Sequence, residues 1–130
     1  MPKDSSVIVA INHTSNWDPV VATIASPRRF SFMAKAELFK FKPFGKLLSS
    51  IGAFPVNRGK GDISSIKTAL TILRSGEVMA IFPEGTRVRN NQSVTPKPGA
   101  VMLATRAKVP IVPMRIEGKY RWMSKINIYI

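Results

Sequence analysis

The sequence predicts an α/β fold, a single layered domain with a largely parallel or mixed sheet flanked by helices. Short apolar runs rich in β-branched residues alternate with longer stretches of helical periodicity, which is the pattern of strand–helix units. A length of 130 residues, 45% of them hydrophobic, suffices for one core and is too short for a second. Since no repeat or linker divides the sequence, we expect residues 1–130 to form one domain.

The first half of the chain predicts three strands and two helices. Val7–Ile11 is a run of five apolar residues that ends before Asn12, as a buried strand would. Asp18 followed by Pro19 predicts a helix that reaches about Ala25, because aspartate is a good N-cap and proline suits the first helical position. We then expect a strand at residues 30–34, a helical stretch at 36–51 interrupted at Pro43, and a short strand at 53–56.

The second half contains the most regular helical pattern, between residues 63 and 75. Its apolar residues recur every three or four positions, Asp62 can cap its start, and Gly76 stands where a glycine ends a helix. The remaining elements that we expect are a buried strand at 78–82, a polar loop at 88–98, a helix at 100–108, a strand at 110–116 and a final strand at 126–130.

The charge of the chain predicts an anionic partner. The 20 lysines and arginines exceed the 7 acidic residues and give a net charge of +13, which suits a nucleic acid, a membrane surface or a phosphorylated substrate. The absence of cysteine excludes disulfides, thiolate–zinc sites and cysteine nucleophiles, and a single histidine excludes histidine-rich metal sites. We therefore expect no metal and no bound cofactor. The sequence has no apolar run near the ~18 residues of a membrane-spanning helix.

The only histidine, His13, lies in the segment Asn12–Asp18, after a predicted strand and before a predicted helix. Such junctions carry functional groups in α/β folds. A neutral imidazole there could take a proton from a hydroxyl, and Asp18 could hold its tautomer and stabilise the imidazolium. The alternative is a loop histidine beside an aspartate that only caps the helix, and Asp18 could also serve both roles.

Two further segments contain candidate phosphate ligands. Phe82–Arg87 follows a buried strand, and the turn at Glu84, Gly85 and Thr86 could hold a phosphate with its backbone N–H groups, its hydroxyl and the Arg87 fork. Phe54–Gly59 ends another strand and contains Arg58. The alternatives are a plain turn with an exposed arginine, and a solvated basic loop.

The stretch 35–46 interleaves Phe39, Phe41 and Phe44 with Lys40, Lys42 and Lys46. This stretch could dock on anionic lipid, with aromatic rings in the membrane and lysines at the headgroups. Equally, a helix could pack the phenylalanines inward beneath lysines that reach out to water.

Four blocks in order resemble the glycerolipid acyltransferase family, of the 1-acylglycerol-3-phosphate (lysophosphatidate) acyltransferase type, in a bacterial form. They are Asn-His-Thr-Ser-Asn-Trp-Asp at 12–18, Phe-Pro-Val-Asn-Arg-Gly at 54–59, Phe-Pro-Glu-Gly-Thr-Arg at 82–87 and Val-Pro-Ile-Val-Pro-Met at 109–114. The resemblance extends from about Ser5 to Gly118. No GxSxG, GxGxxG or P-loop motif competes with it.

The resemblance implies roles for the residues of these blocks. His13 would be the general base on the acceptor hydroxyl and Asp18 its partner. The 109–114 block would take part in acyl-donor binding or packing. The acyl group would pass directly from acyl-CoA or acyl-carrier protein, as co-substrate, to lysophosphatidate without a covalent intermediate. The acceptor's phosphate and glycerol would be bound by Arg58, Glu84, Gly85, Thr86 and Arg87.

The expected partners are therefore a lysophospholipid acceptor, an acyl donor, an anionic membrane surface and an acyl-carrier protein, and no nucleic acid is expected. The expected location is peripheral, on the cytoplasmic face of the membrane. Family members carry tens of residues before the histidine block, so we expect the chain to be a fragment. Two alternatives stay open: another lysophospholipid or glycerol-3-phosphate as acceptor, and a basic nucleic-acid-binding module, which the charge alone suggests.

Overall fold

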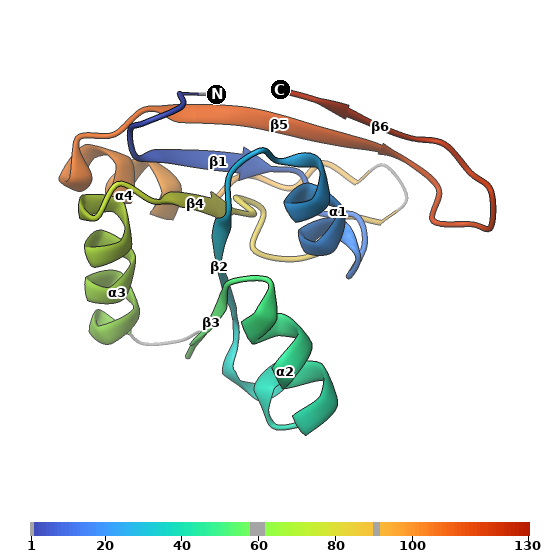
Figure 1. Ribbon diagram of the computed structural model, residues 1–130, viewed down its shortest axis with the longest axis horizontal. Helices are drawn as coiled ribbons and strands as arrows, with labels where there is room; N and C mark the ends of the chain where they lie inside the picture. Colours follow the sequence, from blue (N-terminus) through green and yellow to red (C-terminus); the bar gives the residue numbers. More distant parts are fainter. Residues whose placement is uncertain (1, 58–61, 90–91) are drawn as a thin grey trace.

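Strands and helices alternate along the chain in the order that the sequence predicts (Figure 1). The computed structural model describes residues 2–57, 62–89 and 92–130. Its elements are β1 (Val7–Ile11), α1 (Asp18–Ala25), β2 (Phe30–Lys35), the 3₁₀ helix η1 (Ala36–Phe39), α2 (Lys42–Ser50), β3 (Ala53–Val56), α3 (Ile63–Arg74), β4 (Val78–Ile81), α4 (Gly99–Ala107), β5 (Ile111–Gly118) and β6 (Ile126–Tyr129).

The six strands form one mixed sheet in the order β3-β2-β4-β1-β5-β6. β1 lies parallel to both β4 and β5, with Val9 opposite Ala80 on one side and Val112 on the other. β2 is parallel to β3 and β4, and only β6 runs antiparallel, beside β5. The prediction of a largely parallel or mixed sheet is confirmed. The carboxyl ends of five strands consequently share one edge, where α/β folds bind their ligands.

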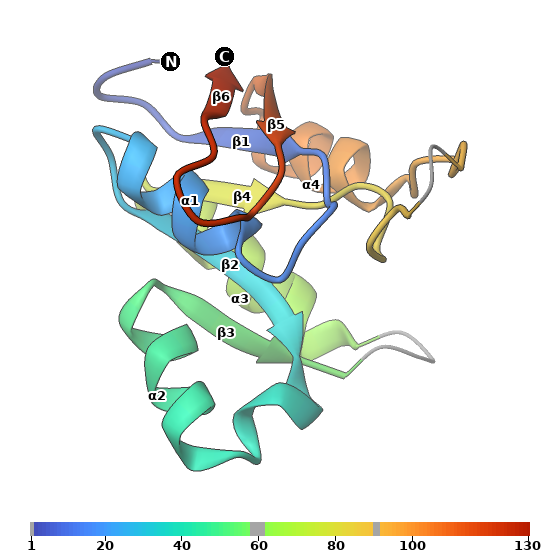
Figure 2. The same ribbon diagram turned by 90° about the vertical axis from the view of Figure 1, so that its right-hand side faces the viewer.

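Helices cover both faces of the sheet (Figure 2). On one face, Ala22 of α1 packs on a cluster that includes Val7, Val9 and Phe32. On the other, α3 and α4 bury small and apolar side chains, Leu73 and Leu103 among them, in a second cluster. α2 lies apart, against η1 and β3. β1 is thus buried from both faces and gives the loop that follows it a rigid base.

Two of the predicted helix signals need correction. Pro43 does not interrupt a helix but stands in the first turn of α2. N–H groups in the first turn have no partner within the helix, so a proline is tolerated there. Asp18 does not cap α1. Trp17 is the residue at the N-cap, without a side-chain bond, and the Asp18 carboxylate turns back to the preceding loop. Two other predictions are confirmed. Asp62 caps the start of α3, since its side chain accepts from the Ser65 N–H, and Gly76, with φ of 90°, follows the end of that helix.

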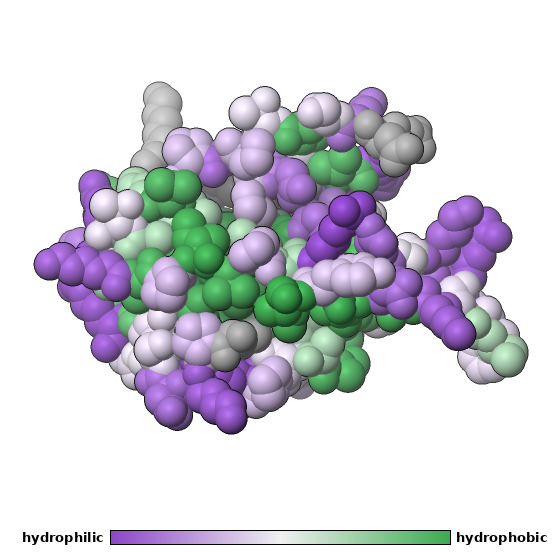
Figure 3. Space-filling model, turned by 90° about the horizontal axis from the view of Figure 1, so that it is seen from above, coloured by the Kyte–Doolittle hydropathy of each residue, from purple (hydrophilic) through white to green (hydrophobic). Residues whose placement is uncertain are grey.

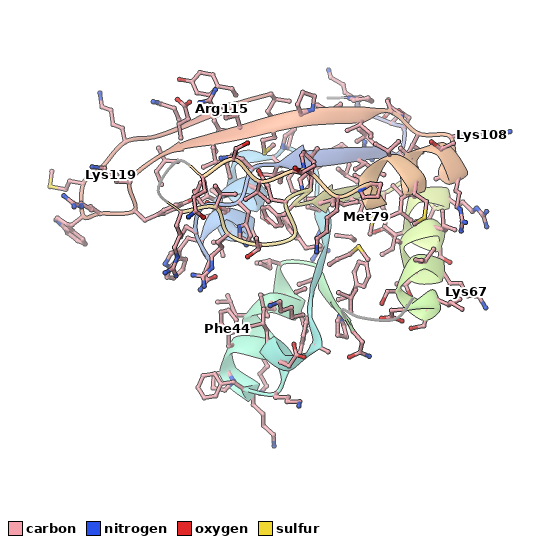
Figure 4. All side chains as sticks on the ribbon, turned by 180° about the vertical axis from the view of Figure 1, so that it is seen from behind. Phe44, Lys67, Met79, Lys108, Arg115 and Lys119 are labelled. Atoms are coloured by element: carbon pink, nitrogen blue, oxygen red, sulfur yellow. The ribbon has the colours of Figure 1, made fainter. Side chains whose placement is uncertain are left out.

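Basic side chains are spread over the molecule rather than gathered in one stripe. Figure 4 shows Lys67 on α3, Lys108 after α4, Arg115 on β5 and Lys119 beyond it on separate parts of the surface. Seen from above, apolar groups gather over the body of the molecule and hydrophilic ones at its projecting ends (Figure 3). Among the helices of the described residues, none has the length and apolar character needed to cross a membrane.

Candidate active site

The loops after β1 and β4 bring two predicted motifs together at the carboxyl edge of the sheet. The Val88 N–H donates to the His13 carbonyl oxygen at 2.7 Å, which ties the end of the 82–87 segment to the histidine backbone. The rings of His13 and Phe82 lie 4.3 Å apart, centre to centre, at an angle of 30°. Residues that are 69 positions apart in the sequence therefore share one site, because their strands are neighbours in the sheet.

His13 and Asp18 form the hydrogen-bonded pair that the sequence predicts. The His13 Nδ1 lies 3.0 Å from the Asp18 Oδ2. Asp18 is fully buried, and the His13 side chain keeps 18% of its surface exposed. A carboxylate can only accept, so Nδ1 carries the proton and the lone pair of Nε2 is left for a substrate.

Hydrogen bonds keep the buried Asp18 ionised. Burial acts to raise the pKa of its carboxyl. Bonds from His13, from the Tyr120 hydroxyl and from the N–H groups of Ser15 and Thr14 outweigh burial and hold the pKa below its ordinary value. The two backbone bonds are 2.6 and 2.7 Å long. The site therefore contains a fixed negative charge behind the imidazole at neutral pH.

Tyr120 is the site residue that sequence reasoning missed. Its hydroxyl donates to Asp18 Oδ1 from the loop between β5 and β6. Burial, and then the neighbouring carboxylate, raise the pKa of Tyr120, so that it stays a donor. One signal could have found it. β5 is a parallel neighbour of β1, so residues just after β5 return to the edge where His13 lies.

His13 opens onto a cleft of about 230 Å³. Three of the predicted acceptor ligands, Gly85, Thr86 and Arg87, line the same cleft. Lys35, which the sequence shows only as the start of the basic stretch 35–46, lines it too. The remaining wall comes from Asn16, Pro19, Met33, Ala34, Leu38, Phe44, Leu48 and Phe82. The cleft thus combines a base, an arginine fork and an apolar wall.

The other predicted ligands do not line this cleft. Glu84 is outside its lining, and the Glu84 Oε2 is buried with no hydrogen-bond partner among the described residues. Arg58 lies outside the residues that the structure describes. The 109–114 block begins β5 and pairs with β1, Ile111 opposite Ile8. Met114 of this block is buried in the core, whereas Pro110, Ile111 and Pro113 are exposed, so only part of the block packs in the sheet.

No cluster of three or more histidines or carboxylates that could hold a metal occurs in residues 2–57, 62–89 and 92–130.

A family model described as Acyltransferase matches residues 1–117. The chain belongs to the acyltransferase family. The 1-acyl-sn-glycerol-3-phosphate acyltransferase of Bacillus subtilis (strain 168) is 41% identical to it over 120 residues, which are 91% of this chain and 59% of that protein. The corresponding enzyme of Streptococcus pneumoniae (strain ATCC BAA-255 / R6) is 37% identical over 118 residues, 89% of this chain and 43% of its own length. The resemblance to the bacterial lysophosphatidate type is confirmed.

The acyltransferase fold is also known from a solved structure. The crystal structure of the 1-acyl-sn-glycerophosphate (LPA) acyltransferase PlsC from Thermotoga maritima superposes with a TM-score of 0.74 at 26% sequence identity, and covers 98% of this chain and 56% of that one. The chain therefore spans about half the length of the relatives it matches.

Proposed function

We propose that this acyltransferase domain transfers a fatty acyl group from a thioester donor to the free hydroxyl of lysophosphatidate. The observation that carries the proposal is the convergence of His13 with Thr86 and Arg87 on one cleft. A hydroxyl held there by its own phosphate would lie within reach of the base. The names of the relatives, 1-acyl-sn-glycerol-3-phosphate acyltransferases, support this choice of acceptor.

The chemistry follows from the His13–Asp18 pair. The His13 Nε2 takes the proton of the acceptor hydroxyl while its oxygen attacks the thioester carbonyl, and the buried Asp18 carboxylate stabilises the imidazolium that forms. Collapse of the tetrahedral intermediate breaks the carbon–sulfur bond. The imidazolium then returns its proton to the thiolate that leaves. In this direct transfer every bond and proton is accounted for without a covalent enzyme intermediate.

The acceptor is held by charge and by hydrogen bonds. Arg87 and Lys35 both line the cleft, so a phosphate there would meet two cations beside the Thr86 hydroxyl. Glu84, which does not line the cleft, is proposed as a ligand of the glycerol on the family resemblance alone. Arg58, outside the described residues, is proposed as a further phosphate ligand on the family resemblance alone.

The acyl chain has an apolar path beside the base. A pocket of about 220 Å³ shares Met33, Phe82 and Gly85 with the cleft and is otherwise lined mostly by apolar side chains of α3, α4 and β4. Acyl-CoA and acyl-carrier protein are both polyanionic donors that fit a chain with a net charge of +13.

The surface around η1 and α2 supports peripheral binding to an anionic membrane. Phe41 is 68% exposed, and Leu38 and Leu47 are also exposed large apolar residues. Lys40, Lys42 and Lys46 are exposed on the same short segment, whereas Phe39 and Phe44 are partly buried. Phe39 and Phe44 are thus packed partly inward, whereas Phe41 and the three lysines face outward. We propose that this surface docks on the cytoplasmic face, where it would bring the cleft to lipid substrates.

The experiment that tests the proposed function is mass spectrometry of products from a panel of acceptors with each donor. We expect phosphatidate from lysophosphatidate at the highest kcat/KM. A higher kcat/KM for glycerol-3-phosphate or another lysophospholipid would show that this compound, and not lysophosphatidate, is the acceptor. Binding of nucleic acid with no acyl transfer would refute the proposed function and favour a nucleic-acid-binding module.

Arg87→Ala tests the phosphate site within the same assay. Because a charge-assisted bond contributes about 1.5–3 kcal/mol, the loss should lower kcat/KM for lysophosphatidate about ten- to a hundredfold, with partial rescue by Arg87→Lys. The slow reaction of a neutral monoacylglycerol should be nearly unchanged. Arg89→Ala, at an exposed arginine outside the cleft lining, is the matched control. Equal losses for both acceptors would assign Arg87 a structural role.

A further inference from the structure

The loop between β5 and β6 supplies a residue to the catalytic pair from 102 positions further along the chain. We infer that Tyr120 is a positioning residue for acyl transfer, one that acts through Asp18 and not on the substrate. The inference rests on the proposed function, since it assigns His13 as the base. Tyr120 would be the third member of the His13–Asp18 group, and it lies outside all four sequence blocks.

The distribution of donors over the two carboxylate oxygens shows why this contact matters. Asp18 Oδ2 accepts from His13 Nδ1 and from the N–H groups of Thr14 and Ser15. These three donors all belong to the short loop that Asp18 itself follows. Among the described residues, Tyr120 is the donor to Asp18 that comes from another part of the chain. Without it, the carboxylate is oriented only by the loop whose histidine it has to orient.

The strand that leads to Tyr120 is bonded to the strand that leads to His13. The β1–β5 ladder ends with Ile11 opposite Met114. The Asn12 side chain then extends it, because its Oδ1 accepts from the Ile116 N–H at 2.7 Å and its Nδ2 donates to the Ile116 carbonyl at 2.9 Å. Asn12 directly precedes His13, and Ile116 lies four residues before Tyr120. His13 and Tyr120 therefore follow two strands, β1 and β5, that are bonded to each other.

The chemistry of a phenol suits a fixed donor beside a buried carboxylate. The raised pKa of Tyr120 keeps the hydroxyl protonated throughout the pH range in which a histidine base works. A carboxylate held from both sides cannot rotate when the imidazole becomes charged during the reaction. Loss of one such partner misaligns the base rather than removing it, so the expected cost is on the order of tenfold in kcat.

The test compares Tyr120→Phe with Tyr129→Phe, the matched removal of a phenol hydroxyl from an exposed tyrosine on β6. We expect kcat to fall about tenfold for Tyr120→Phe, with KM for both substrates within about twofold and no change for the control. In an Asp18→Asn background the same substitution should have no further effect, because its route to the base has been removed. A tenfold loss that persists in that background would overturn the inference.

A second readout does not require activity. The chain has one histidine, so ¹⁵N NMR gives a single imidazole spectrum. We expect the Nδ1–H tautomer in the parent chain and in Tyr129→Phe, and a mixture of tautomers in Tyr120→Phe. An unchanged tautomer together with unchanged kcat would overturn the inference. If no donor and acceptor react at all, the proposed function fails, while the NMR result still decides whether Tyr120 orients the pair.

The parent chain offers a check in case Tyr120→Phe does not fold. With tyrosines labelled at ¹³Cζ, the Tyr120 signal should show no ionisation as the pH passes the ordinary tyrosine pKa of about 10. Ionisation of Tyr120 at that ordinary value would mean that its hydroxyl does not donate to Asp18, and would refute the inference.

Discussion

Replacing Asp18 separates what this carboxylate does for the loop from what it does for the base. Asp18→Ala leaves four donors without the buried carboxylate that accepts from them: His13 Nδ1, the N–H groups of Thr14 and Ser15, and the Tyr120 hydroxyl. An unsatisfied buried donor costs about 1–3 kcal/mol, and the loop can rehydrate part of the set. We expect a loss of about 3–5 kcal/mol in the free energy of unfolding.

Asp18→Asn should have a different effect, because the amide oxygen can still accept from the loop while its NH₂ group donates to the Tyr120 oxygen. We expect a loss of about 1 kcal/mol, or a fall of about 4 °C in Tm. The negative charge behind the imidazole is lost in both variants. Both should therefore lose on the order of 10³-fold in kcat.

The assays are thermal unfolding followed by circular dichroism and acyl transfer to lysophosphatidate at saturating donor. Asp4→Asn, at an exposed aspartate near the N-terminus, is the control for a lost negative charge. An Asp18→Asn variant that keeps its kcat within about tenfold would remove Asp18 from the mechanism. An Asp18→Ala variant as stable as the parent chain would show that these four hydrogen bonds do not hold the loop.

Four further predictions follow from the same geometry. His13→Ala should lose at least about 10²-fold in kcat with an unchanged circular dichroism spectrum, and near-normal turnover would exclude it as the base. Because the pKa of Asp18 is lowered in the folded chain, its stabilising contribution is present above the unfolded value of about 3.9 and is lost as the pH falls through the lower folded value. Acid unfolding of Asp18→Asn should therefore have a shallower pH dependence, and an identical curve would contradict this assignment. Incubation with labelled acyl donor and no acceptor should leave the intact mass of the chain unchanged, and a stoichiometric acyl adduct would refute direct transfer. The Arg28 guanidinium donates to the carbonyls of Pro2, Ser5 and Gly76, so Arg28→Met should cost about 2–3 kcal/mol in the free energy of unfolding with kcat unchanged at 25 °C. A Tm equal to that of the parent chain would contradict this.

Local signals in the sequence sufficed for most elements and for the approach of His13 to Asp18. β1 is readable from five consecutive apolar residues, and α3 from its cap, its periodicity and Gly76. His13 and Asp18 are five residues apart, so a short loop brings them together without help from the rest of the chain. The N-cap role of Asp18 was wrong because one carboxylate can satisfy either a helix end or a loop, and the sequence does not distinguish these.

What the sequence could not provide depends on contacts between distant residues. Tyr120 meets Asp18 across 102 positions, and Asn12 meets Ile116 across 104. Neither pairing has a local pattern, because both depend on β5 lying beside β1 in the sheet. Lys35 is a similar case, since the sequence shows it as one lysine in a basic stretch and only the fold brings it to the cleft.

The position of β1 at the centre of the sheet has a consequence for synthesis of the chain. Of the six strands, β1 is translated before the others, and its neighbours β4 and β5 begin about 70 and about 100 residues later, at Val78 and Ile111. At about 5–20 residues per second, the most apolar strand waits on the order of 4–14 s for its first partner. During that time its unpaired edges can join those of other chains. The β1 segment of a newly made chain therefore stays open to such pairing until β4 has emerged, and the trio of His13, Asp18 and Tyr120 can assemble only after Tyr120 has left the ribosome, 107 residues after His13.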